Sequence, residues 1–312
     1  MIPPAPTPDQ VWSLLLALRR HTRESATVPT RCSLRLDSDG QPAVTPAADP
    51  AALLDIAADA TWTARTPLAA ASAELLDLYL TMALAGRDRP LTVAHLGQSL
   101  DGRIATADGA SYYVTGPANL THLHRMRAIC DAIVVGAGTV ERDDPQLTTR
   151  RVVGPHPVRV VLDPRRRLAA DHGLFHDRTT PTLLVCAEAR IDEPAPGYAE
   201  LVGVPMQGSR LNLRALLQRL WERRLFAVFI EGGGLTVSAF LEQRLLDRLQ
   251  VTVAPLIIGS GRPGITLPAI VDLSQGLRPR HRRYVMGEDV LFDCRLRDGP
   301  SEPTPRSGFQ AT

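Results

Sequence analysis

Residues 226–243 read FAVFIEGGGLTVSAFLEQ, and this stretch indicates the kind of fold to expect. A short apolar run ends at Glu231, a glycine triplet follows, and an apolar pattern with helical spacing comes after the glycines. A strand that is apolar throughout and passes directly into a helix is typical of a parallel sheet buried on both faces. The segment therefore predicts one strand–helix unit of an α/β fold.

The same alternation continues on both sides of this unit. Further apolar runs predict strands: LTVAHL, AIVVGAG, PVRVVLD, TLLVCA and RLQVTVAPLIIG. Residues 117–129 and the stretch LNLRALLQRLWERRL have the spacing of helices. We therefore expect residues 89–297 to form an α/β domain whose mainly parallel sheet is flanked by helices. The stretch RLQVTVAPLII ends in a potential edge strand of that sheet.

The chain changes character on either side of this domain. Residues 1–88 are rich in Ala and Pro, with helical patterns near residues 11–20 and 72–85 and a strand pattern at residues 31–37 between them. We expect a small helical accessory segment of unknown role, because no catalytic pattern occurs in it. Residues 298–312 have too little apolar surface to offset the entropy of ordering, which predicts a disordered tail.

The composition excludes several classes of protein and of chemistry. Of 312 residues, 44% are hydrophobic and 22% charged, as in an ordinary globular protein, and a net charge of +2 gives no electrostatic case for nucleic acid. All 35 basic residues are arginine, which excludes lysine nucleophiles and the lysine of a phosphate-binding loop. Four scattered cysteines without a CxxC motif predict that no metal is bound. Neither a basic leader nor an apolar run of about 18–20 residues occurs, so we expect a cytoplasmic protein with no membrane partner.

The glycine triplet of the first stretch is a candidate phosphate site. Gly232, Gly233 and Gly234 lie where the predicted strand passes into the helix. Glycines allow a ligand to approach the backbone, and the first turn of a helix presents unpaired N–H groups to a phosphate. The carboxylate of Glu231 favours this interpretation, since ligands bind beyond the carboxyl ends of parallel strands. A tight turn without a ligand is the alternative.

A second glycine motif occurs in AIVVGAGTVERDDPQLTTR, residues 132–150. Gly136-Ala137-Gly138 is half of a dinucleotide-binding fingerprint, but Glu141 stands where the third glycine would be. Thr139 can cap a turn here, and Asp143-Asp144-Pro145 can be an ordinary Asp-Pro turn rather than a metal site.

The third informative stretch, HLGQSLDGRIATADGASYYVTG, covers residues 95–116. Ser99-Leu100-Asp101-Gly102 predicts a turn between two strands, in which Asp101 has a structural, hydrogen-bonding role. Ser111 and Tyr113 lie in a polar stretch that can face a cleft.

Taken in order, these stretches resemble the reductase domain of the bacterial bifunctional riboflavin-biosynthesis deaminase/reductase, a family with a dihydrofolate-reductase-like fold. The resemblance rests on HLGQSLDGRIA, ASYYVTG, LHRMRAICDAIVVGAGTVERDDPQLTTR, PVRVVLD, IEGGGLTVSAFL and LLDRLQVTVAPLIIGSG, and it spans nearly all of residues 89–297. It implies that NADPH reduces the ribosyl group of 5-amino-6-(5-phosphoribosylamino)uracil to ribityl. It also implies a homodimer, since the family commonly dimerises through sheet edges.

The resemblance assigns site residues by motif position. The implied cofactor-binding residues are Gly97, Tyr113, Thr139, Asp143, Gly233, Gly234, Leu235 and Thr236. The implied substrate-binding residues are Ser111, Arg127, Leu147, Arg150 and Glu231. Glu231 is also the candidate catalytic residue, because a carboxylate can orient the pyrimidine or the sugar and influence proton delivery to the opened ring.

Arginine chemistry is consistent with these assignments. The forked guanidinium donors of Arg127 and Arg150 suit a sugar phosphate, and solvated arginines are the alternative. Arg165, Arg166 and Arg167 follow a predicted strand, where they can bind the 2′-phosphate that distinguishes NADPH from NADH or simply lie in a solvated loop.

The chain departs from the family at two points. His95 stands where the family often has a lysine beside the substrate, so either the substrate differs or His95 is a buried strand histidine. The family's deaminase needs an H-x-E and a P-C-x-x-C motif, and neither occurs, so we expect no deamination. Two other functions stay open, namely reduction of a pterin-like or specialised-metabolite substrate and a non-catalytic nucleotide-binding sensor.

Overall fold

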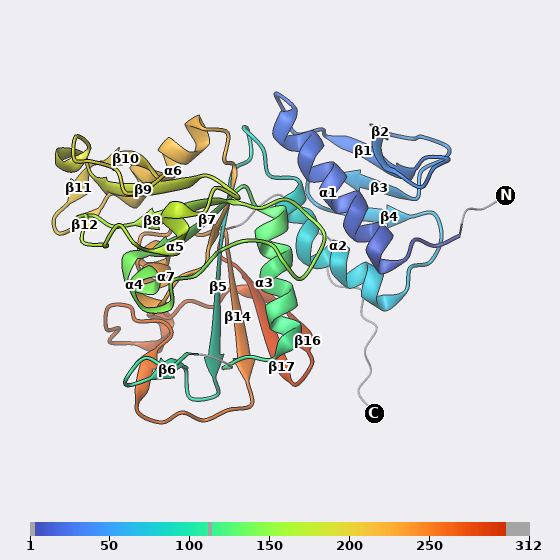
Figure 1. Ribbon diagram of the computed structural model, residues 1–312. Coiled ribbons are helices and arrows are strands. Elements are labelled where there is room, and N and C mark those ends of the chain that lie inside the picture. Colours follow the sequence, from blue (N-terminus) through green and yellow to red (C-terminus); the bar gives the residue numbers. More distant parts are fainter. Residues whose placement is uncertain (1–3, 112–113, 298–312) are drawn as a thin grey trace. The chain divides into compact units, whose positions relative to one another are not determined.

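The structure is a computed structural model, and it describes residues 4–111 and 114–297. The chain divides into two compact units, one built on residues 1–88 and the other on Arg89–Arg297 (Figure 1). Tyr113 and the expected tail at residues 298–312 lie outside the described residues.

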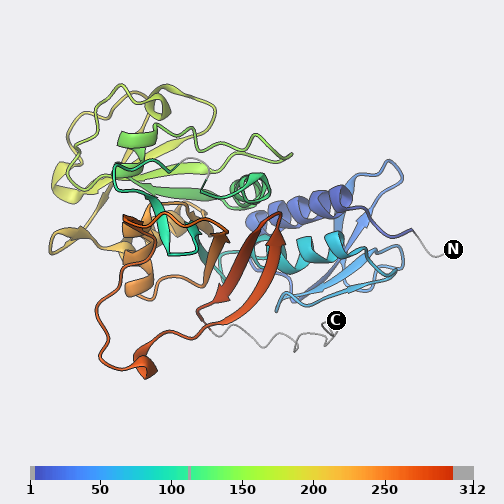
Figure 2. The same ribbon diagram turned by 90° about the horizontal axis from the view of Figure 1, so that it is seen from below.

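The second unit is built on a sheet that has nine strands within the described residues (Figures 1 and 2). The strand order is β10-β9-β8-β7-β13-β5-β14-β17-β16. From β10 to β14 in this order, neighbouring strands pair in parallel. Strand β17 pairs antiparallel with β14 on one side and with β16 on the other. The strands are β5 (Leu91–Ser99), β7 (Ala132–Gly136), β8 (Val158–Leu162), β9 (Thr182–Ala187), β10 (Glu200–Val204), β13 (Ala227–Ile230), β14 (Arg248–Ala254), β16 (Arg280–Met286) and β17 (Asp289–Arg295). The predicted α/β fold with a mainly parallel sheet is confirmed.

Helices cover both faces of this sheet. They are α3 (Pro117–Ile129), α4 (Ala137–Asp143), α5 (Gly173–His176), α6 (Leu213–Glu222) and α7 (Gly234–Glu242). The helix predicted at residues 117–129 is α3, with the same bounds. His95 of β5 contacts Asn119 of α3, whereas its neighbour Leu96 belongs to the apolar core with α6 and α7. Because successive side chains of a strand point to opposite faces, α3 lies on one face and α6 and α7 on the other.

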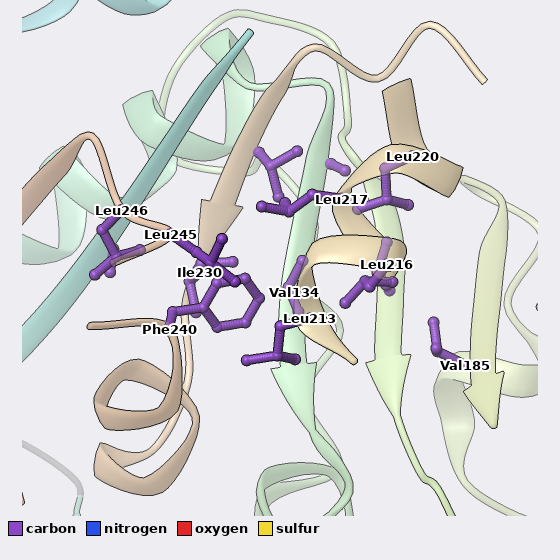
Figure 3. Close-up of a cluster of buried hydrophobic side chains, with 14 of the residues drawn as sticks. Val134, Val185, Leu213, Leu216, Leu217, Leu220, Ile230, Phe240, Leu245 and Leu246 are labelled. Carbon is purple, nitrogen blue, oxygen red and sulfur yellow. The ribbon is translucent and has the colours of Figure 1, made fainter. Parts of the chain in front are cut away.

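The apolar core forms where α6 and α7 pack on the sheet (Figure 3). Residues three and four positions apart share one face of a helix. On α6 that face carries four buried leucines: Leu213, Leu216, Leu217 and Leu220. Figure 3 shows them in one cluster with Val134 of β7, Ile230 of β13 and Phe240 of α7. Burial of each such side chain contributes roughly 1.5–3 kcal/mol to the stability of the fold. Because Ile230, the last residue of β13, belongs to this core, the packing holds the end of that strand in place.

Short elements complete this unit. They are the paired strands β6 (Arg103–Thr106) and β15 (Gly261–Pro263), the paired strands β11 (Met206–Gln207) and β12 (Arg210–Leu211), and the 3-10 helices η1 (Glu188–Arg190) and η2 (Leu273–Gln275). The turn predicted after Ser99 lies between β5 and β6, with Gly102 at φ +75°. Asp101 accepts hydrogen bonds from the Ser99 hydroxyl and from the N–H groups of Ile258 and Gly259, which together lower its pKa to about 2. Its predicted structural role is confirmed.

The prediction that RLQVTVAPLII ends in an edge strand is wrong. Its strand β14 pairs with β5 on one side and with β17 on the other. The later hairpin of β17 and β16 adds to the sheet beyond β14, so β16 forms that edge. The polar, arginine-rich sequence RHRRYVM of β16 carries too few apolar residues to predict a strand.

The first unit is less helical than its sequence predicts. Its helices α1 (Pro8–Glu24) and α2 (Ala70–Ala83) and its strand β1 (Arg31–Leu36) match the predicted patterns. The described residues also hold β2 (Pro42–Pro46), β3 (Leu54–Ala57) and β4 (Trp62–Ala64), in an antiparallel sheet of order β2-β1-β3-β4. These three strands are short and contain Ala and Pro, so their alternation is too weak to predict them. In the described chain, no helix combines the length and the apolar character that a bilayer span needs.

Candidate functional site

An ion pair between two predicted substrate residues lies at the end of the central strand. Glu231 directly follows β13, the fifth of the nine strands described, and its N–H donates to the Val134 carbonyl of β7 at 3.0 Å. Arg127, in the last turn of α3, donates its Nε to Glu231 Oε2 at 2.8 Å and its Nη2 to Oε1. The side chains are only 11% and 19% exposed. Burial opposes the guanidinium charge, but the carboxylate outweighs it and raises the pKa of Arg127, so the guanidinium stays charged.

The segment of residues 147–150 lies against this pair. Arg127 Nη1 donates to the Thr148 carbonyl at 3.2 Å. Leu147 is buried in a left-handed conformation with φ +55°. Arg150 donates its Nη1 to Gln146 Oε1 and, at 3.2 Å, to Thr148 Oγ1. Burial and the nearby Arg127 and Arg151 lower the pKa of Arg150, and Glu231 opposes them. The structure therefore brings Arg127, Leu147, Arg150 and Glu231 together, as the sequence predicts.

Ser111 is not joined to this group. It is half-buried in the segment between β6 and α3. In residues 4–111 and 114–297 we find no hydrogen bond from Ser111 to Arg127, Arg150 or Glu231. Its assignment to the substrate stays a prediction.

The predicted cofactor residues of the two glycine motifs lie together. An added Cβ on Gly136 would stand 2.8 Å from Thr236 Oγ1, and one on Gly233 would stand 3.9 Å from Thr139 Oγ1. An added Cβ on Gly234 would stand 2.3 Å from the carbonyl oxygen of Gly264. The N-terminal turns of α4 and α7 therefore adjoin, and neither has a side-chain cap. We call this arrangement the glycine cradle.

The glycine cradle has the features that a pyrophosphate group needs. Gly136 and Gly234 let neighbouring parts of the chain lie close to the two helix starts, and Gly233 leaves room, since the nearest atom to an added Cβ there is Thr139 Oγ1 at 3.9 Å. The first turn of a helix presents unpaired N–H groups to a phosphate. Leu235, also predicted at the cofactor, lies in the first turn of α7 with 85% of its surface exposed, so it is available to a ligand. The residues present thus fit a dinucleotide.

Two other predicted cofactor residues stand at other points of the fold. Gly97 lies in β5, three residues after Ala94, which pairs with Ile230 at the end of β13. An added Cβ on Gly97 would stand 2.8 Å from Thr115 Cγ2. Asp143 ends α4, where burial raises its pKa against the opposing effect of Arg142 and Arg262. Tyr113 lies outside the described residues.

The three consecutive arginines have different environments. Arg166 donates to the carbonyls of Glu193 and Pro194, so its guanidinium has a structural role. Arg167 reaches α4, where it pairs with Glu141 at 3.2 Å and its Nη2 lies 3.6 Å from the position of a Cβ on Gly138. Of these two arginines, Arg167 is therefore the one beside the glycine cradle.

His95 is a buried strand histidine. Its Nε2 lies 3.0 Å from both Asn119 Oδ1 and Thr252 Oγ1. Burial, helped by the neighbouring His122, lowers its pKa to about 3, so the ring is neutral at physiological pH. It cannot supply the cationic charge of the lysine that the family often has at this position.

Sequence patterns miss two histidines beside the substrate segment. The N–H of Arg150 donates to His124 Nδ1 at 2.9 Å, and the N–H of Thr149 donates to His156 Nδ1 at 3.1 Å. His124 lies in a stretch that carries the resemblance but is assigned no role there, His156 lies outside those stretches, and the chain holds eight histidines. A pocket of about 520 Å³ adjoins the segment, lined by Asp144, Gln146, Thr148, Arg150, His156, Arg159, Gly173, Leu174, Asp177 and Thr179.

Comparison with known proteins places these features in a family context. Residues 90–283 match the family described as the RibD C-terminal domain. The chain is 34% identical over 213 residues to the 2,5-diamino-6-ribosylamino-4(3H)-pyrimidinone 5′-phosphate reductase of Methanothermobacter thermautotrophicus, covering 66% of this chain and 97% of that one. It is 30% identical to the riboflavin biosynthesis protein RibD of Aquifex aeolicus, covering 66% of this chain and only 58% of that longer one.

Solved structures agree with this comparison. A diaminohydroxyphosphoribosylaminopyrimidine deaminase/5-amino-6-(5-phosphoribosylamino)uracil reductase of Thermotoga maritima aligns with a TM-score of 0.58 at 26% identity, over 72% of this chain and 61% of that one. RibD of Acinetobacter baumannii has the same fold, with a TM-score of 0.62 at 22% identity over 92% of this chain and 98% of that one.

Proposed function

The chain belongs to the RibD C-terminal domain family, and from this premise we propose that it is a reductase of riboflavin biosynthesis that acts on a ribosylamino-pyrimidine 5′-phosphate. The observation that carries the proposal is the buried Arg127–Glu231 pair at the end of the central strand, which is linked through Thr148 to Arg150. Two guanidinium groups and one carboxylate at a strand end suit a ligand with both a phosphate and hydrogen-bond donors.

We propose 5-amino-6-(5-phosphoribosylamino)uracil as the substrate, with its ribosyl group reduced to ribityl. The Thermotoga maritima protein is named for this compound, whereas the Methanothermobacter thermautotrophicus enzyme is named for the 2,5-diamino pyrimidinone. The two compounds differ in the pyrimidine and share the ribosyl phosphate. The same arginines can therefore hold either one, and an assay of both identifies the substrate.

We propose NADPH as the cofactor, held by the glycine cradle. The N–H groups at the start of α4 and α7 would bind its diphosphate, and Thr139 and Thr236 would add hydroxyl groups. Arg167, beside Gly138, is the candidate for its 2′-phosphate. When bound, the cofactor supplies the hydride that adds to C1′ of the ribosyl group.

The protein's own residues then bind and orient the substrate. Arg127 and Arg150 supply charge-assisted donors to the phosphate and to sugar oxygens. Two acceptor positions of Glu231 are taken by Arg127, and its remaining lone pairs accept from a sugar hydroxyl or a pyrimidine N–H. Holding the sugar and the cofactor in one arrangement lowers the entropic part of the barrier.

The decisive test is NADPH oxidation by the purified chain with each of the two pyrimidines. We expect turnover that Arg150→Ala and Glu231→Gln both abolish or strongly reduce. NADPH binding without oxidation of either compound would instead indicate a nucleotide sensor or another substrate.

We also propose that the chain acts as a homodimer in the cytoplasm. Strand β16 forms one edge of the sheet within the described residues, and its antiparallel hairpin with β17 supports an edge-to-edge contact between two copies. Light scattering at micromolar protein measures the mass, and a monomer would contradict the homodimer.

A further inference from the structure

Two histidines hold the segment that carries Leu147 and Arg150. His124 comes from α3, whereas His156 comes from the loop before β8. Their Nδ1 atoms accept the N–H groups of Arg150 and Thr149, at 2.9 and 3.1 Å. Two successive backbone donors of one segment are thus bonded to imidazole rings from two different elements.

An imidazole nitrogen accepts a hydrogen bond only when it carries no proton. In these two hydrogen bonds the Nδ1 atom of each ring is therefore the unprotonated nitrogen. For His124 the surroundings favour this state, because the ring is buried and lies near Arg127, Arg150 and Arg151, which lowers its pKa to about 4.

The segment needs such support. Leu147 has φ +55°, a conformation that costs free energy for any residue with a side chain. Besides the two histidines, Arg127 holds the Thr148 carbonyl, and the Thr149 hydroxyl donates to the Pro155 carbonyl at 2.9 Å. Each of residues 148–150 thus has at least one hydrogen bond that holds its backbone before any ligand binds.

We propose that His124 and His156 are positioning residues, which hold the backbone of residues 147–150 so that Arg150 meets the substrate phosphate in a preset position. This inference rests on the proposed function, because it takes Arg150 as a substrate ligand. Neither histidine touches the reacting atoms in this scheme. Their contribution is to reduce the ordering that substrate binding would otherwise require.

Matched substitutions separate the hydrogen bond from side-chain volume. His124→Asn and His156→Asn keep an acceptor close to the position of Nδ1, whereas His124→Leu and His156→Leu remove it at similar size. His21→Leu, at an exposed position of α1 in the first unit, is the control. Because His156 is exposed, its variants keep the test valid if a change at buried His124 prevents folding.

The first readout is amide hydrogen exchange of the peptide that covers residues 147–151, which needs no turnover. We expect each Leu variant to exchange about tenfold faster than the wild type, as for the loss of one hydrogen bond, and each Asn variant to exchange close to the wild-type rate. The second readout is steady-state kinetics. The Leu variants should raise KM for the pyrimidine phosphate about tenfold with little change in kcat, and the Asn variants should restore it.

Equal exchange and equal KM in all variants would overturn the inference. So would equal losses in the Asn and Leu variants, since that result would indicate packing instead of hydrogen bonding. Failure of the proposed function appears differently, as wild-type protein that turns over neither pyrimidine, and the exchange measurement then still decides whether the histidines hold the segment.

Discussion

Arg127 and Glu231 are 104 positions apart in the sequence, yet their side chains meet in a bidentate ion pair at the end of the central strand. This pair joins α3 to the sheet at the point where the predicted substrate residues gather.

Glu231→Gln tests the carboxylate. The amide faces Arg127 with one acceptor and one donor in place of two acceptors, so we expect kcat/KM to fall roughly 10²- to 10³-fold. Unfolding in denaturant should show a loss of about 1–3 kcal/mol, as for a mismatched buried polar group. Glu193→Gln, in the exposed pair with Arg190, is the control and should change neither quantity. Wild-type kcat/KM in Glu231→Gln would remove this residue from the site.

Gly136→Ala tests the glycine cradle. The new methyl group would stand 2.8 Å from Thr236 Oγ1, so the Thr236 side chain must rotate or the first turn of α7 must shift. We expect the Kd for NADPH to rise about tenfold or more, measured by fluorescence titration, because the helix N–H groups lose their alignment. Gly116→Ala introduces a methyl group at an ordinary contact distance of 3.5 Å and should leave the Kd unchanged. Unchanged affinity in Gly136→Ala would place the cofactor elsewhere.

Arg167→Ala and Arg166→Ala test cofactor preference as a matched pair. Loss of Arg167 should raise KM for NADPH about tenfold and leave KM for NADH unchanged, as expected for one charge-assisted hydrogen bond to a phosphate. Arg166→Ala should lower the melting temperature through its lost carbonyl contacts, without a change of preference. If the two variants have the same NADPH:NADH ratio as the wild type, Arg167 does not bind the 2′-phosphate.

Buried neutral histidines predict a loss of stability in acid. Burial lowers the pKa of His95 to about 3 and of His122 to about 4, from an ordinary value of 6.5. The unfolded chain therefore takes up protons before the folded chain does, so this stability is present above pH 6.5 and is lost as the pH falls from about 6.5 to about 4.

Denaturant unfolding over that pH range measures the effect. His122→Gln keeps a hydrogen-bonding group toward Gln250 and removes the titration, so its stability should depend less steeply on pH, by roughly 3 kcal/mol over the range. His281→Asn, at the exposed edge of the sheet, should have the wild-type slope. Equal slopes in His122→Gln and the wild type would show that His122 does not titrate as expected.

The parts of the fold that sequence predicts are those encoded by local patterns. The helix at residues 117–129 and the strand before Glu231 appear where the sequence predicts them. The strand is apolar and buried throughout, whereas the buried face of the helix also holds polar residues such as His122 and Arg127. Strand β16 could not be predicted, because its sequence is polar and has no apolar alternation. It forms a strand through its backbone pairing with β17. The same holds for β2 to β4 of the first unit.

The residues of the candidate site also divide into those that the sequence predicts and those that only the structure shows. Glu231, Arg150 and the glycines were accessible from the sequence, because the resemblance to the family assigns them by motif position. His124 and His156 were not, since their role depends on backbone N–H groups that only the folded chain brings to them. Arg166 and Arg167 likewise reach different partners in the folded chain, and a run of three identical residues does not predict this difference.

The N–H of Glu231 donates to the Val134 carbonyl, and this bond extends the ladder of β13 and β7 by one residue. The sheet thereby holds the backbone of Glu231, while the bidentate pair with Arg127 holds its carboxylate. Under the proposed function, the movements that admit the substrate and release the product would then come from chain segments outside the sheet.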